Sequence, residues 1–145
     1  MALNFNTQGN LHQTINLTNE EFKQHFGTNS QRMQLLNNAL PFFKIFHSCG
    51  CTDVYVGGSY VSKKKNPEDI DICFDISDIK QEKIKTMFPQ FFDINERGRI
   101  RRDLKCHIFV FDKNDTELFD LLKEDRDGNP KGLVKLDLNE ILKND

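Results

Sequence analysis

Apolar side chains recur at spacings of three and four residues in several parts of the chain, the pattern of a helix with one buried face. The clearest case is the segment 30–50, which predicts a long helix capped by Ser30 and kinked or broken at Pro41. A Thr-x-x-Glu capping box at Thr18 predicts a shorter helix that ends near Gly27. The other segments with a helical pattern are 78–88, 116–123 and a last turn at 139–143.

Short runs of β-branched and aromatic residues predict the strands. In the segment 69–76, side chains alternate between the two faces of the strand. Ile70 and Ile72 are therefore expected to face the core, and Asp69 and Asp71 the opposite side. The predicted strands are 53–57, 69–76, 104–111 and an edge strand at 133–138.

The strongest candidate for chemistry lies between the first two of these strands. Gly57 and Gly58 end the strand at 53–57 and allow the backbone to approach a ligand, and Ser59 adds a hydroxyl where a helix could begin. Asp69 and Asp71 are roughly 7 Å apart on one face of the next strand, a spacing that suits two carboxylates sharing a pair of divalent cations, as in two-metal phosphoryl-transfer sites. The simpler alternative is an ordinary glycine turn followed by a solvated acidic face.

These residues resemble the signature of a known family. A Gly58-Ser59 turn, nine intervening residues and then the paired acids Asp69 and Asp71 are similar to the motif of the nucleotidyltransferase superfamily, especially its small minimal bacterial members. The resemblance implies an α+β domain with a nucleotidyltransferase-like (polymerase-beta-like) mixed β-sheet and helices packed mainly on one face. It also implies that Gly57, Gly58 and Ser59 hold a nucleoside triphosphate, while Asp69 and Asp71 hold Mg²⁺ or Mn²⁺ and take part in catalysis.

The chain departs from the family pattern at the third catalytic acid. The resemblance places that acid on the strand 104–111, where this chain has His107, and Asp103 and Asp112 are too far along to replace it without a shift of register. His107 could act as a general base or a metal ligand. It could equally mark a site that has lost catalysis, or have no role at all.

Two basic segments lie near these motifs. Lys63 begins a run of three lysines in the loop after the glycine turn. Such a run is either a solvated loop tip or a contact for nucleotide phosphates or an RNA backbone. Residues 95–103 carry four arginines around Gly98 and predict an exposed hairpin or loop, whose arginines form either a plain surface or a phosphate-contacting rim.

The resemblance therefore implies a Mg²⁺-dependent enzyme that moves a nucleoside monophosphate from an NTP to a hydroxyl on RNA or protein. It also suggests a role in a toxin–antitoxin or defence system, with a cognate toxin or antitoxin as partner. The alternative is a catalytically degenerate module of the same fold that binds a nucleotide or a partner protein.

Composition and charge exclude few of these functions. The 145 residues predict one domain, with residues 1–17 as an extended N-terminal arm on its surface. A net charge of −2 gives no overall attraction to nucleic acid, so any such contact would need a local patch. No apolar run is long enough to span a bilayer, and the first residues lack the pattern of a secretory signal. We therefore expect a cytoplasmic protein without a membrane partner, whose four cysteines are reduced thiols.

Overall fold

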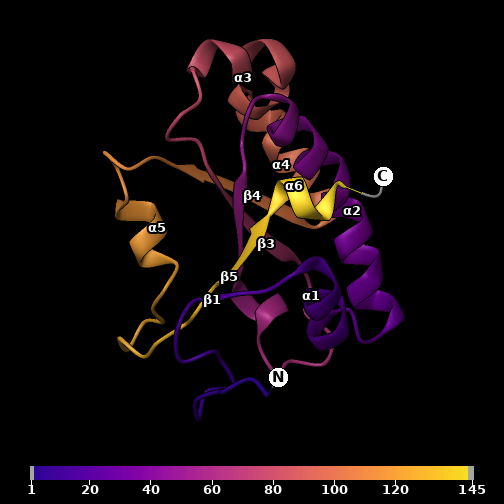
Figure 1. The fold of residues 1–145 in the computed structure, drawn as a ribbon, viewed down its shortest axis with the longest axis vertical. Coiled ribbons are helices and arrows are strands. Elements are labelled where there is room, and N and C mark those ends of the chain that lie inside the picture. The colour runs from indigo at the N-terminus through magenta and orange to yellow at the C-terminus, as the bar shows by residue number, and fades with distance from the viewer. Residues whose placement is uncertain (1, 144–145) are drawn as a thin grey trace.

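The computed structural model describes residues 2–143, which form one mixed β-sheet surrounded by helices (Figure 1). The sheet has five strands in the order β1-β5-β2-β3-β4. β2 runs antiparallel to both β3 and β5, whereas β3 pairs in parallel with β4, and β1 with β5. The strands are β1 (Ile15–Asn16), β2 (Asp53–Gly57), β3 (Ile70–Asp75), β4 (Cys106–Phe111) and β5 (Val134–Asp137). The helices are α1 (Asn19–Phe26), α2 (Ser30–Ser48), α3 (Gln81–Met87), α4 (Ile94–Leu104), α5 (Glu117–Leu121) and α6 (Leu138–Ile141), with the 3₁₀ turns η1 (Gly58–Val61) and η2 (Pro89–Phe92).

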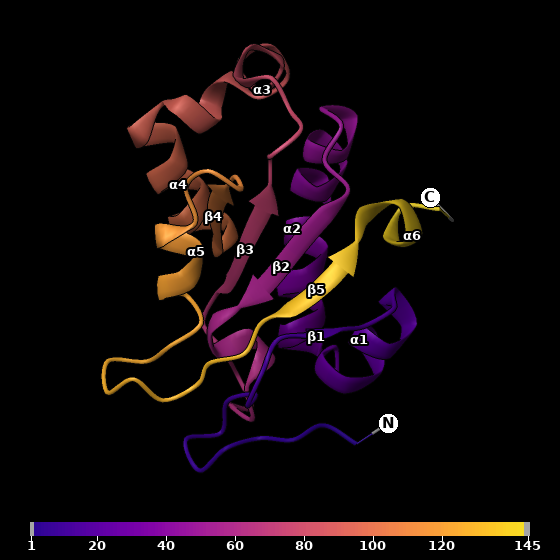
Figure 2. The same ribbon diagram turned by 60° about the vertical axis from the view of Figure 1, so that its left-hand side comes forward.

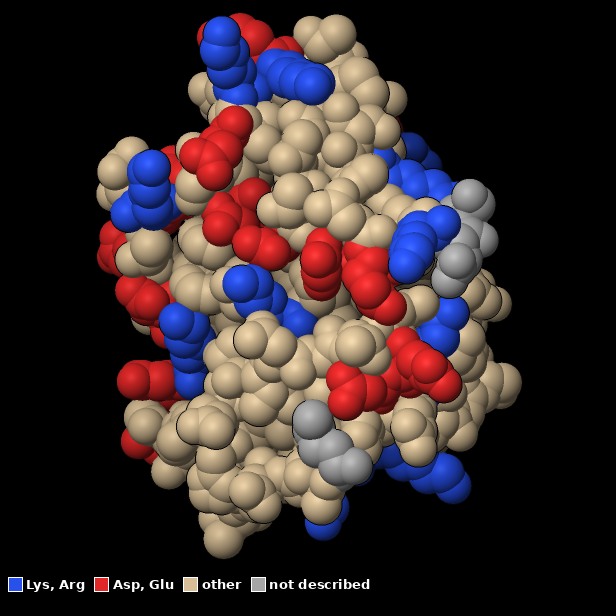
Figure 3. Space-filling model, in the orientation of Figure 1, with Lys and Arg blue, Asp and Glu red and all other residues tan. Residues whose placement is uncertain are grey.

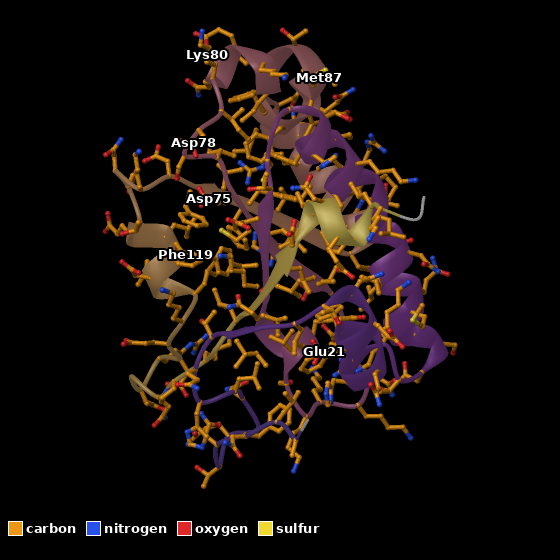
Figure 4. The ribbon with its side chains drawn as sticks, in the orientation of Figure 1. Glu21, Asp75, Asp78, Lys80, Met87 and Phe119 are labelled. Carbon is orange, nitrogen blue, oxygen red and sulfur yellow. The ribbon has the colours of Figure 1, made fainter. Side chains whose placement is uncertain are left out.

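Helices cover the two faces of the sheet unequally (Figure 2). The long helix α2 lies across one face, where Phe46 stacks on Phe74 of β3 with ring centroids 3.9 Å apart. Helices α3, α4 and α6 all neighbour α2, whereas α5 lies alone on the opposite face. There Phe119 stacks on Phe111 of β4 at 4.1 Å (Figure 4). The predicted α+β class, with a mixed sheet and helices mainly on one face, is confirmed.

The first two helices begin with side-chain caps. The capping box at Thr18 is present, since its hydroxyl accepts from the Glu21 amide and its own amide donates to the Glu21 carboxylate. The cap predicted at Ser30 is wrong by one residue, because Asn29 accepts from the Arg32 amide at 2.8 Å and Ser30 is already helical. Pro41 does not divide the segment into two helices, which was one of the two predicted options, because α2 is continuous through it. Buried side chains before and after Pro41 pack in one core and keep the helix continuous.

The prediction of a loop at residues 95–103 is wrong, because these residues form most of α4. The missed signal is Asp93, whose carboxylate caps the helix by accepting from the amides of Asn95 and Glu96. Gly98 lowers helix propensity, but the buried Ile100 anchors the helix against the core. The arginines therefore have fixed positions along one helix.

The edge position predicted for the strand at 133–138 is also wrong. β5 lies inside the sheet, because Ile15 and Asn16 of the N-terminal segment pair with Val134 and Lys135. Leu11, 2% exposed, belongs to the main core. The segment expected to be an arm thus completes the sheet.

All four cysteines are buried free thiols, as predicted. Burial raises the pKa of Cys51, Cys73 and Cys106 to about 12, so these thiols are protonated at neutral pH and act as small apolar side chains. Among the helices of residues 2–143, none combines the length and apolar character that a bilayer crossing requires.

Candidate functional site

The glycine turn lies directly against the second carboxylate. β2 ends at Gly57, and Gly58 opens η1 with a φ of 69°, a left-handed conformation that side chains other than glycine rarely adopt. A Cβ atom at Gly58 would collide with the Asp71 carboxylate. Only glycine therefore lets the turn approach Asp71 this closely.

Strand register brings a histidine to the other side of the same carboxylate. Asp71 on β3 is paired with Gly57 on β2 and with His107 on β4. The His107 Nδ1 lies 3.6 Å from the Asp71 Oδ1, and both side chains are about one quarter exposed (27% and 24%). Of the two predicted acids, Asp71 is thus the one that His107 faces.

Burial and neighbouring charges move both groups away from their charged forms. Burial raises the pKa of Asp71 to about 6, and the charge of Asp69 adds to this, while Lys131 and Arg101 oppose it. Burial lowers the pKa of His107, and Arg101 adds to that effect, while Asp69 opposes it. At neutral pH the imidazole is therefore mainly uncharged, and its 3.6 Å contact with Asp71 is longer than a hydrogen bond. An unprotonated imidazole in this place can accept a proton.

The other predicted site residues lie at different distances from this centre. Asp69 immediately precedes β3 and lines a hollow of about 500 Å³ with Glu68 and the basic C-terminal end of α4. Ser59 lies in η1, where its carbonyl accepts from the Ser62 hydroxyl at 2.6 Å. Lys63 lines a different hollow, of about 330 Å³, whose walls include neither Asp69 nor Asp71. Its amide donates to the Gly9 carbonyl, so the loop packs against the N-terminal segment.

The structure also reveals a residue that holds the turn in place. Arg32 on α2 is 3% exposed and has no acidic partner within hydrogen-bonding distance among the described residues. Its guanidinium donates instead to backbone carbonyls of two separate segments. These include the carbonyl of Phe26 at the end of α1, at 3.2 Å, and that of Ser62 after η1, at 3.1 Å. It also donates to the carbonyl of Tyr60 in η1 and lies over the Tyr60 ring. No local sequence pattern distinguishes Arg32 from other polar residues near the start of a helix, so only its tertiary contacts identify it.

Asp69 and Asp71 are the candidate ligands for a divalent cation. Within residues 2–143 no group of three or more His, Cys, Asp or Glu side chains is arranged to hold a metal ion. Mg²⁺ is, however, commonly bound by one or two carboxylates together with phosphate oxygens and water. The charge of Asp69 helps to raise the pKa of Asp71, and a cation held by these two residues would relieve that repulsion. These residues could thus hold a cation that arrives with a phosphorylated ligand, whereas a preformed cage for two metals is not found.

Comparisons with known proteins give a family and one distant likeness. Residues 3–137 match the model of a family described as a family of unknown function (DUF6932). The fold is also similar to a crystal structure of a proposed nucleotidyltransferase from Sulfolobus solfataricus, at 16% identity and a TM-score of 0.35, over 70% of this chain and 93% of that one. No curated protein matches the chain.

Proposed function

The chain belongs to the family of unknown function DUF6932, and we propose that this protein is a Mg²⁺- or Mn²⁺-dependent nucleotidyltransferase. In this proposal a hydroxyl on RNA or protein attacks the α-phosphorus of an NTP, the bond between the α- and β-phosphates breaks, and the nucleoside monophosphate is transferred with release of pyrophosphate. Gly57, Gly58 and Ser59 bind the phosphates, Asp69 and Asp71 hold the cation, and His107 receives the proton of the attacking hydroxyl.

One observation carries the proposal: the turn at Gly58, directly after β2, meets the carboxylate of Asp71 on β3, which is paired with His107 on β4. A glycine turn suits phosphate oxygens, because no side chain blocks the approach to its backbone, and carboxylates suit the cation that accompanies them. Phosphoryl transfer needs little else from a protein than positioning and charge neutralisation. The three elements supply both functions in one place.

The bound cation and the residues of the chain would have different roles in the reaction. When bound, the cation supplies neutralisation of phosphate charge and polarises the reacting oxygens. The amides at the glycine turn orient the phosphates. Because burial and Arg101 keep His107 mainly uncharged at neutral pH, it can take a proton where the superfamily pattern has a third acid.

A transfer assay tests the proposal. Purified protein is incubated with each α-labelled NTP, Mg²⁺ or Mn²⁺ and a cell extract, and label on RNA and protein bands is measured. The Asp69→Asn/Asp71→Asn variant is expected to lose transfer by about 100-fold or more, because charge neutralisation at the phosphates is lost.

Asp75→Asn is the matched control, since Asp75 lies on the same face of β3 but at the far end of the strand from Asp71 (Figure 4). Its oxygen contact with Ser77 can be kept by an amide. Equal transfer by the double variant and the wild type would contradict the assignment of Asp69 and Asp71.

A second candidate function is favoured by the lack of a third acid. With His107 at that position and no group of three metal-ligating side chains within the described part of the chain, the protein could bind an NTP without transferring it. Calorimetry with ATP and Mg²⁺ separates the two candidates, since binding without any transfer identifies a binding module. A toxin–antitoxin or defence role, with its cognate partner, is proposed on the resemblance alone.

A further inference from the structure

Helix α4 carries arginines on the side of the candidate site that lies away from the glycine turn. β3 lies between β2 and β4 in the sheet, so Gly58 approaches Asp71 from one side and His107 from the other. Between α4 and β4 is a cavity of about 220 Å³, lined by Arg97, Gly98, Arg101 and His107 among others. This cavity opens beside the proposed catalytic groups.

A second hollow continues the cavity along the helix. It has a volume of about 500 Å³, shares Gly98 and Arg101 with the first, and is also lined by Asp69, Arg102 and Lys105. No atom lies within 4 Å of a Cβ built at Gly98, so the glycine leaves this wall open. We call the two hollows together the α4 cleft.

The arginines of α4 differ in what they already bind. Arg97 donates to the Ile108 carbonyl at 2.8 Å and stacks on Phe91, so it is fixed in the wall. Arg99 and Arg102 form exposed ion pairs with their helix neighbours Glu96 and Asp103. The Arg101 side chain, by contrast, makes no hydrogen bond or ion pair with any residue of the range 2–143 that the structure describes.

Arg101 is nevertheless part of the electrostatics of the site. It lines the same cavity as His107, and its charge lowers the pKa of both Asp71 and His107. A cation in this place can receive the phosphate of a bound molecule with its full hydrogen-bonding capacity.

An apolar surface adjoins the α4 cleft. A groove of about 640 Å³ shares Arg97 and Ile94 with the cleft and is lined by Phe92. Phe92 and Ile94 are 42% and 84% exposed, and the Lys85 ammonium lies over the Phe92 ring, 5.6 Å from its centroid. Cations beside an exposed aromatic ring are the combination that binds single-stranded nucleic acid, through backbone phosphates and stacked bases.

We propose that the α4 cleft binds the phosphodiester backbone of a single-stranded nucleic acid through Arg101, with a base stacked on Phe92. This inference rests on the proposed function in one respect, because the bound strand would be the acceptor of the transfer. The glycine turn then binds the NTP on the β2 side of Asp71, and the acceptor strand binds on the β4 side. The acceptor class is a polynucleotide rather than a protein.

The charge of the whole molecule does not explain such binding. The net charge is −2, and on the face drawn in Figure 3 basic and acidic side chains are interspersed without a continuous basic patch. Affinity for a polyanion would therefore depend on the local cations of the α4 cleft.

Fluorescence anisotropy with a labelled 12-nucleotide strand tests the inference. The protein is titrated without NTP or metal, using RNA and DNA of the same sequence at several salt concentrations, so that the result does not depend on transfer activity. Arg101→Gln is expected to weaken binding by about five- to tenfold and to reduce the salt slope by nearly one. Phe92→Leu is expected to weaken binding by about fivefold or more without changing the salt slope.

Arg99→Gln is the matched control, because Arg99 lies on the same helix, is paired with Glu96 and lines neither hollow. It is expected to change affinity by less than about twofold. Equal losses for Arg101→Gln and Arg99→Gln would overturn the inference, as would no binding of either strand by the wild type. Transfer of label to a protein, undiminished in Arg101→Gln, would overturn it while leaving the proposed function intact. Binding to the strands that depends on Arg101, with no transfer to any acceptor, would support the cleft and reject the enzyme.

Discussion

The contact between Gly58 and Asp71 sets the character of the candidate site. The turn covers the carboxylate on one side and the β4 strand covers it on the other, so Asp71 is held in a place that disfavours its charge. Binding sites often keep such groups at a cost in stability, because the group is needed for a ligand. The cost can be measured in this protein.

We predict that Asp71→Asn stabilises the protein, by an amount that grows with pH. Burial raises the pKa of Asp71 from 3.8 to about 6, so below pH 4 the group is protonated in both the folded and the unfolded state. Between about pH 4 and pH 6 the unfolded state has released this proton while the folded state still holds it, so the folded state loses stability as the pH rises, and the loss levels off above pH 6. The asparagine does not titrate, so the variant should gain about 1–3 kcal/mol relative to the wild type between pH 4.5 and 7.5.

Urea denaturation of both proteins in EDTA, at half-unit pH steps, gives this difference. The charges of Asp69, Lys131 and Arg101 face Asp71 and are the same in both proteins. A difference in unfolding free energy that does not change with pH would contradict the assigned environment of Asp71.

Single residues of the site differ in how readily the sequence reveals them. Gly58 and Asp71 stand in local patterns of strand, turn and alternation, which are short-range and therefore readable. His107 could be placed because its strand is regular enough to fix a register. Arg32 and Arg101 could not be identified, because their roles depend on contacts with segments far away in the sequence.

Among the elements, α2 and the loop after the glycine turn are coupled through Arg32. Its guanidinium donates to carbonyls of η1 and of the lysine-rich loop, and Tyr60 returns the contact by donating to the Arg32 carbonyl at 2.9 Å. The helix thus holds the backbone that follows Gly58. A rigid phosphate-binding turn requires such support.

Arg32→Met tests this coupling. The methionine keeps much of the buried apolar volume but leaves several carbonyls without a donor, so we expect a loss of about 2–4 kcal/mol in the free energy of unfolding. Amide hydrogen exchange should rise in residues 60–65 more than in the rest of the molecule. Arg32→Lys is the graded control, since an ammonium donates at most three hydrogen bonds and should restore part of the stability. Uniform exchange along the whole chain would show that Arg32 does not act on this loop in particular.

Elements were predicted best where one local signal decides them. The capping box fixed α1, and the strands at the site follow from β-branched runs and glycine breaks. Helix α4 was missed because four arginines and Gly98 hide its amphipathic pattern, although the Asp93 cap was readable. The internal position of β5 was missed because its neighbour β1 has only two residues, too few for any pattern.

At the scale of the whole molecule, the N-terminal segment closes the fold. The Leu11 carbonyl accepts from Gly132 at 2.8 Å, and Gly132 lies so close to Gln13 that a Cβ there would collide with its backbone. These contacts join the segment to the approach to β5, and β5 pairs with β2, which leads into the glycine turn. The segment is thus connected to the candidate site through the sheet.

Leu11→Ala distinguishes an integral segment from an accessory arm. Leu11 is 2% exposed in the main core, so its truncation removes buried area and leaves a cavity, at an expected cost of about 2–4 kcal/mol. Because the segment, the sheet and α2 share one core, unfolding in urea should remain a single transition at a lower midpoint, with the same midpoint by far-UV circular dichroism and by tyrosine fluorescence. Leu121→Ala is the matched control: Leu121 is 67% exposed, and the same truncation there should change stability by less than about 0.5 kcal/mol. If Leu11→Ala left the midpoint unchanged, or added a separate early transition, the segment would be an arm on the surface. The sheet would then end at β5 as far as its stability is concerned.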